Sequence, residues 1–260
     1  MAENTRRNFL KKSALASLMA LSLPEVLSAS NIVAFDSENK SLTFLFQGDS
    51  ITDGNRGRNA DPNHIMGHGY AYSIASCIGA DFCKDNHHFI NKGISGNTIS
   101  DLEKRWQSDA LDLNPDVISI LVGINDVASE IDKKPTALNS LEFENKYRKL
   151  ILDSMKANSA TVLVLCLPFV APVGKRSADF EDWNQATMER ADCIQKLAKE
   201  YNTALVNFPQ VLERAIKKAP AEYWIWDGIH PTVPFHTLMA REWIKEVSKR
   251  LPFLKGYSGL

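Results

Sequence analysis

The sequence predicts an α/β protein of three layers, in which helices cover both faces of a doubly wound, five-stranded parallel sheet. Short apolar runs rich in β-branched residues alternate along the chain with segments of helical spacing. These runs are nearly continuously apolar, which is typical of parallel strands buried on both faces. With 260 residues, 44% of them hydrophobic and 23% charged, the chain is long enough for one full core.

The expected strands end at a common edge of the sheet. We expect strands at 42–48, 89–91, 117–122, 160–166 and 203–207, and helices at 70–78, 99–107, 141–157, 183–201, 210–218 and 234–250. Ligands of such sheets bind beyond the carboxyl ends of the strands. Ser50, the Gly93–Gly96 turn, Asn125 and the loop from Pro168 to Asp179 directly follow strands, so we expect them along this edge.

The first thirty residues differ in kind from the rest. Arg6 and Arg7 precede an apolar stretch, 13–23, that is too short to span a bilayer and is followed by Pro24 and small residues. This pattern resembles a twin-arginine export signal. The sequence therefore predicts an export signal at 1–30 and a single catalytic domain at 31–260, located in the bacterial periplasm or outside the cell without a stable membrane anchor.

Charge and cysteine content restrict the possible partners. The formal net charge is −1 and the basic residues are scattered, which argues against a nucleic-acid partner. No Cys-x-x-Cys pair suggests zinc or redox chemistry, and Cys77 and Cys166 lie in apolar stretches that favour buried free thiols. The sequence leaves open whether any cysteines form disulfides, and it does not define the oligomeric state.

Ser50 is a candidate nucleophile because it follows a buried strand, at the edge of the sheet. A serine needs a base, a group that orients the base and donors for the oxyanion. Of six histidines, His230 is the best candidate base, because Asp227 lies three residues before it in a glycine-containing turn. His64 and His68 have the spacing of a metal pair, but no glutamate lies between them. For these two, and for the adjacent His87 and His88, we expect surface or loop positions.

Four sequence blocks together resemble the GDSL, or SGNH, hydrolases. They are Gly48-Asp49-Ser50, Gly93-Ile-Ser-Gly96 with Asn97-Thr98, Gly123-Ile-Asn125-Asp126 and Asp227-Gly-Ile-His230-Pro231. Each block alone is a weak signal, but the four occur in the family's order and cover essentially all of 31–260. The first block has Ile51 where the family's name has leucine, which is a conservative change.

The resemblance implies a flavodoxin-like fold and a role for each block. Ser50 would be the nucleophile, His230 the general base and acid, and Asp227 its orienting carboxylate. The oxyanion hole would consist of the backbone N–H groups of Ser50 and Gly96 and the side-chain amide of Asn125. Gly93 is a rival for the role of Gly96. No metal and no organic cofactor is needed for this chemistry.

Two further features of these blocks have simpler explanations. Ser95 lies beside Gly96 but not in a Gly-x-Ser-x-Gly nucleophile elbow, so it is a poor alternative nucleophile. We expect Asp49 and Asp126 to fix loops through hydrogen bonds to the backbone rather than to transfer protons.

The implied reaction is hydrolysis of a carboxylic ester through an acyl-serine. Polar residues in the loops at 53–68 and 168–179 favour short acyl groups, and Trp183, Trp224 and Trp226 offer flat faces for sugar rings. We therefore expect a short-chain, acetyl-removing esterase that acts on small-molecule or carbohydrate esters. The alternatives are a lipid esterase, lysophospholipase or thioesterase, an acyltransferase, and a non-catalytic carbohydrate-binding protein of the same fold.

Overall fold

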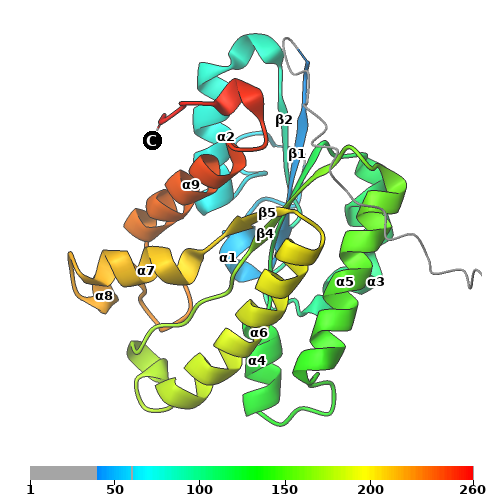
Figure 1. The fold of residues 1–260 in the computed structure, drawn as a ribbon. Helices are drawn as coiled ribbons and strands as arrows, with labels where there is room; N and C mark the ends of the chain where they lie inside the picture. The colour runs from blue at the N-terminus through cyan, green and yellow to red at the C-terminus, as the bar shows by residue number, and fades with distance from the viewer. Residues whose placement is uncertain (1–39, 60, 260) are drawn as a thin grey trace, which may run out of the picture. The chain divides into compact units, whose positions relative to one another are not determined.

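The computed structural model describes residues 40–59 and 61–259, in which five strands form one parallel sheet (Figure 1). The strands are β1 (Thr43–Gly48), β2 (His88–Asn91), β3 (Val117–Leu121), β4 (Val162–Cys166) and β5 (Ala204–Val206). Their order across the sheet is β2-β1-β3-β4-β5. The register pairs Gly48 with Leu121 and Leu121 with Cys166, so the carboxyl ends of the three central strands are level.

Helices cover both faces of this sheet, as Figure 1 shows. One face carries α2 (Tyr70–Asp81), α7 (Phe208–Ile216) and α9 (Val233–Val247), and the other carries α3 (Ile99–Asp109), α5 (Ser140–Ala157) and α6 (Phe180–Glu200). The predicted three-layer, doubly wound fold is confirmed. The shorter elements are α1 (Ser50–Asp53), α4 (Ile124–Ile131), α8 (Ala221–Trp224), and the 3-10 helices η1 (Cys83–Asp85), η2 (Leu111–Leu113), η3 (Gly174–Arg176) and η4 (Pro252–Leu254).

Alternate residues of each strand divide between the two cores. On β1, Phe44 and Phe46 pack with α2 and α9, whereas Leu45 packs with the residues of α3 and α5. Successive side chains of a strand point to opposite faces, so a strand buried on both faces is mostly apolar along its length. This explains why the strands could be located from continuous apolar runs.

Two structural elements at the site were not predicted as helices. Ser50 begins the helix α1, whose N-cap is Asp49, and Asn125 lies in the first turn of α4. The sequence after β1 and after β3 contains glycine and polar residues that we interpreted as loops. Both helices start directly at the end of a strand, and α1 is too short to show a helical period.

The predicted export signal lies outside the described residues. Within those residues, no helix is long and apolar enough to cross a membrane. All four cysteines carry free thiols, and Cys166 is buried as expected, whereas Cys77 is half-buried.

Candidate active site

Ser50 is held at the end of β1 by a tight turn. The side chain of Asp49 accepts a hydrogen bond from the backbone N–H of Ile51 at 3.0 Å, which caps α1. Gly48 allows the close approach of β3, because a Cβ at this position would lie 2.2 Å from the carbonyl oxygen of Leu121. The strand therefore delivers Ser50 to the sheet edge in a fixed orientation.

His230 and Asp227 extend from Ser50 as a chain of hydrogen bonds. The distance from Ser50 Oγ to His230 Nε2 is 2.8 Å, and the distance from His230 Nδ1 to Asp227 Oδ2 is 2.7 Å. The other oxygen of Asp227 accepts from the backbone N–H groups of Ile229 and His230 at 2.9 and 2.8 Å. The carboxylate thus holds both the ring and the backbone of the turn that carries the histidine.

The electrostatics of this turn keep Asp227 ionised. Partial burial opposes ionisation, but hydrogen bonds from His230 and Ile229 outweigh it and lower the pKa of Asp227 below its ordinary value. The turn itself is anchored to the loop after β4, since Ala171 N–H donates to the carbonyl of Gly228 at 2.8 Å. An ionised acceptor on Nδ1 selects the tautomer in which Nε2 accepts a proton from Ser50.

The residues expected to bind an oxyanion lie in three segments, which are α1, the turn that contains Gly96, and α4. Within the described chain, neither the N–H of Ser50 nor that of Gly96 has a hydrogen-bond acceptor. Asn125 Nδ2 donates to the carbonyl of Asn97 at 3.2 Å, which places this amide against the turn that contains Gly96. A primary amide has two N–H donors, so one donor of Asn125 remains uncommitted.

The rival nucleophile and the rival bases do not form the hydrogen-bond chain that joins Ser50 to Asp227. Ser95 is bonded to Asp53 through both its N–H and its hydroxyl, at 3.0 and 3.1 Å, and not to a histidine. His236 is buried on α9, where its Nδ1 accepts from Tyr70 N–H at 3.1 Å and thereby caps α2. The remaining four histidines lie on loops or at the start of β2. His64, His68 and His88 are exposed, whereas the side chain of His87 is buried.

Asp49 and Asp126 bond to the backbone, as predicted. Asp126 accepts from the N–H of Ile99 at 3.2 Å and so joins α4 to α3. Burial raises the pKa of both carboxyl groups to about 7, and for Asp126 the neighbouring Asp49 adds to this effect. Neither carboxyl has a hydrogen bond to His230 or to Ser50.

The three candidate tryptophans do not share one environment. Trp183 and Trp224 are buried in the core, with exposed fractions of 4% and 8%, which contradicts a role in sugar contacts for these two. Trp226 is 66% exposed, and its ring centroid lies 6.4 Å from that of His230. Only the third tryptophan therefore presents a free face beside the Ser50–His230 pair.

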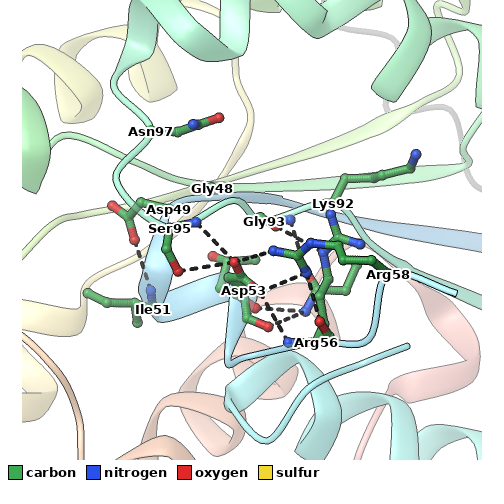
Figure 2. Close-up of polar contacts among 12 residues, drawn as sticks. Gly48, Asp49, Ile51, Asp53, Arg56, Arg58, Lys92, Gly93, Ser95 and Asn97 are labelled. Atoms are coloured by element: carbon green, nitrogen blue, oxygen red, sulfur yellow. Dashed lines mark hydrogen bonds and ion pairs between the residues drawn. The ribbon is translucent and has the colours of Figure 1, made fainter. Parts of the chain in front are cut away.

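Asp53, the most heavily bonded carboxylate near Ser50, was not among the site residues predicted from the sequence. Figure 2 shows it between Ser95 and Arg58, at the end of the short helix that Ser50 begins. Its position three residues after the serine was a possible signal, because i and i+3 side chains lie on one side of a helix. The i, i+3 relation applies only within a helix, and this segment was interpreted as a loop.

Taken together, fold and geometry define an α/β protein with a Ser–His–Asp hydrogen-bond chain at the carboxyl edge of its sheet. Comparison with known proteins agrees with this class. Residues 46–238 match the model of the GDSL-like lipase/acylhydrolase family. The chain is 30% identical to an acetylxylan esterase of Geobacillus stearothermophilus over 209 residues, which cover 78% of this chain and 92% of the relative.

Solved structures give the same result. A Parabacteroides merdae protein classed as a GDSL-like lipase superposes with a TM-score of 0.75 and 34% identity, over 80% of this chain and 96% of that one. The acetylxylan esterase Axe2 of Geobacillus stearothermophilus superposes with a TM-score of 0.70 and 28% identity, over 80% and 94% of the two chains. The chain belongs to the GDSL-like lipase/acylhydrolase family and is a carboxylic ester hydrolase.

Proposed function

We propose that Ser50 is the nucleophile of this hydrolase, His230 its general base and acid, and Asp227 the carboxylate that orients the histidine. The observation that carries the proposal is the continuous chain of hydrogen bonds, 2.8 Å from Ser50 to His230 and 2.7 Å from His230 to Asp227. The negative charge of Asp227 stabilises the imidazolium that forms when His230 takes the serine proton.

The oxyanion of the tetrahedral intermediate is bound by three neutral donors. The N–H groups of Ser50 and Gly96 have no other acceptor in the described chain, which supports this role. Gly96 has a φ of +84° with open space beside its Cα, so the turn presents backbone rather than a side chain. The uncommitted donor of Asn125 supplies the third hydrogen bond.

Hydrolysis proceeds in two steps. Ser50 Oγ attacks the ester carbonyl while His230 takes its proton, and the alcohol leaves with that proton as the acyl-serine forms. A water molecule then attacks the acyl-serine, and His230 again accepts and returns the proton. The first step breaks the ester bond of the substrate, and the second breaks the acyl-serine ester, releases the carboxylic acid and restores Ser50. No atom changes its oxidation state.

We propose acetyl groups on carbohydrates as the substrate class. The acetylxylan esterase relatives support this proposal, and so does Trp226, whose exposed ring beside His230 offers a stacking surface on the alcohol side of the ester. The polar loop after α1 contains Arg56 and Arg58 rather than an apolar run for a long acyl chain. We further propose export, from the Arg6-Arg7 pattern; N-terminal sequencing of the secreted or periplasmic protein tests it.

The assay is hydrolysis of 4-nitrophenyl acetate by Ser50→Ala and His230→Ala. Each variant should lose several orders of magnitude in kcat while its circular dichroism stays that of the parent, because the two residues act as one unit. Ser95→Ala is the matched control for the rival serine. Near-normal turnover by folded Ser50→Ala, with an inactive Ser95→Ala, would refute the assignment.

A further inference from the structure

Asp53 is a buried carboxylate that is tied to more groups than local folding of α1 requires. It is 2% exposed, and Arg58 donates to both of its oxygens, at 3.1 and 2.7 Å. Burial opposes ionisation, but the hydrogen bonds from Arg58 and Ser95 outweigh it, so the pKa of Asp53 lies below its ordinary value. Burying a charge is costly unless it is paired, and here a two-pronged arginine pairs it.

A third bond to Asp53 is local, from the Arg56 N–H to Oδ1 at 3.1 Å, whereas two others join the segments that carry Ser50 and Gly96. Its Oδ2 accepts from both the N–H and the hydroxyl of Ser95, the residue immediately before Gly96 (Figure 2). Asp53 itself ends the helix that Ser50 begins. One carboxylate therefore connects the helix that carries Ser50 to the residue that precedes Gly96.

Backbone packing brings these segments into direct contact at Gly93. A Cβ on Gly93 would lie 2.4 Å from the backbone nitrogen of Asp53, and Arg56 Nε donates to the Gly93 carbonyl at 2.9 Å. The start of the turn is thus fixed against α1. Gly96, in contrast, has no atom other than those of its chain neighbours within 4 Å of the position of a Cβ, so no packed group on that side holds it in place.

The direction of the Gly96 N–H therefore depends on the hydrogen bonds of its neighbours. Ser95 is bonded to Asp53, and on the other side Asn97 N–H donates to the Ile94 carbonyl at 3.1 Å. Removing the Asp53 bonds would release one side of this turn. A peptide with a left-handed glycine has several accessible orientations once released.

We propose that Asp53, held by Arg58, is a positioning residue that fixes the Ser95–Gly96 turn so that the Gly96 N–H points at the oxyanion. The inference rests on the proposed roles of Ser50 and Gly96. The oxyanion forms fully only after attack, so loss of the position affects the transition state more than the bound substrate. Asp53→Asn should lower kcat about 10- to 100-fold and change KM by less than about threefold.

The test compares Asp53→Asn with a control in a similar environment. Glu144 is a carboxylate that is 8% exposed on α5 and bonded to Arg148 and Lys196, so Glu144→Gln also breaks a buried ion pair, but away from the sheet edge. Steady-state kinetics with 4-nitrophenyl acetate are measured for both, together with thermal unfolding. We expect both variants to lose stability and only Asp53→Asn to lose kcat.

A second measurement reports on the oxyanion itself. 1,1,1-Trifluoroacetone adds to a nucleophilic serine as a hemiketal whose oxygen is bound like that of the intermediate. Its inhibition constant should rise in Asp53→Asn by about the same factor as kcat/KM falls, and should not change in Glu144→Gln. If Asp53 had only a structural role, the inhibition constant would not rise by the factor by which kcat/KM falls.

Further variants separate the possible outcomes. If Asp53→Asn does not fold, the test uses Arg58→Lys instead. Arg58 is 52% exposed, and lysine keeps the positive charge but cannot donate to both oxygens of Asp53 in the way a guanidinium does. Folded Asp53→Asn or Arg58→Lys with kcat within twofold of the parent would overturn the inference. An active Ser50→Ala would instead overturn the proposed function, whereas an inactive Ser50→Ala beside a fully active Asp53→Asn overturns the positioning role alone.

Discussion

The buried His236 should make the stability of this protein depend on pH. It is 7% exposed, and its Nδ1 accepts the hydrogen bond from Tyr70 N–H that caps α2. Burial is the main cause that lowers its pKa from 6.5 to about 4, and nearby His68 and His230 add to the effect. The perturbation that tests this is His236→Gln, since a glutamine keeps a hydrogen-bond acceptor but does not titrate.

The sign follows from which state binds the proton. Above the unfolded pKa of 6.5, His236 is neutral in both states, and its contribution to stability is fully present. As the pH falls below that value, the unfolded chain takes up the proton first, so the folded state loses free energy relative to it until the folded pKa is reached. Linkage gives a loss of about 2 kcal/mol between about pH 7.5 and about pH 5.

The assay is urea unfolding at these two pH values, followed by tryptophan fluorescence and analysed by linear extrapolation. Other acids and bases titrate in both proteins, so the difference in unfolding free energy between parent and variant isolates His236. We expect that difference to shift by about 2 kcal/mol in favour of His236→Gln at the lower pH. The exposed His64 provides the matched control, His64→Gln. A shift below about 0.5 kcal/mol, or an equal shift in the control, would refute the reasoning.

Three predictions concern catalysis. Asn125→Ala should lower kcat about 10²-fold with little change in KM, because its amide acts on a charge present only in the transition state; unchanged kcat with a lowered Tm would instead show that it only holds Asn97. Trp226→Ala should raise KM for acetylated xylo-oligosaccharides about fivefold, equivalent to about 1 kcal/mol of stacking, and leave 4-nitrophenyl acetate unaffected; equal effects on both substrates would contradict a sugar-stacking role. Acetyl esters should be cleaved at least as well as butyryl and far better than octanoyl esters, below micelle-forming concentrations. A lipid pocket would instead raise kcat/KM with chain length, since each buried methylene contributes about 0.8 kcal/mol.

The sheet could be predicted because its signal is local. All five strands are runs of consecutive residues, and burial on both faces makes the three central strands mostly apolar, with Gln47 and Ser119 as buried polar exceptions. The helix α4 could not be predicted in the same way, because it starts at Gly123 with polar residues that also suit a loop. Its apolar side is buried against α6, which lies far along the chain, so the packing partner cannot be inferred from the local sequence.

The site residues, too, could be predicted where the signal is local and could not be predicted where tertiary packing decides. The spacing of Asp227 and His230 identified a pair that the structure joins by a hydrogen bond, since three residues in a turn bring two side chains together. The environments of the tryptophans could not be inferred from spacing, because Trp224 and Trp226 are two residues apart and yet one is buried and the other exposed. Burial is decided by which element packs there, in this case Phe235 of α9 against Trp224.

The carboxyl groups around Ser50 show why such partners matter for the chemistry. Burial without a cationic partner in hydrogen-bond contact raises the pKa of Asp49 and Asp126, whereas hydrogen bonds lower that of Asp227 and Asp53. A carboxylate beside a developing oxyanion would repel it, since like charges interact strongly where water is scarce. Asp227 avoids this because His230 becomes positive as the oxyanion forms.

Asp53 avoids the same repulsion by a different route, since the Arg58 guanidinium neutralises it permanently. It can therefore fix the Ser95–Gly96 turn as a strong acceptor without opposing the charge that this turn stabilises. A neutral acceptor would not repel the oxyanion either, but it would hold the turn with weaker hydrogen bonds. The Asp53–Arg58 ion pair therefore holds the Ser95–Gly96 turn with strong hydrogen bonds and adds little negative potential at the position of the oxyanion.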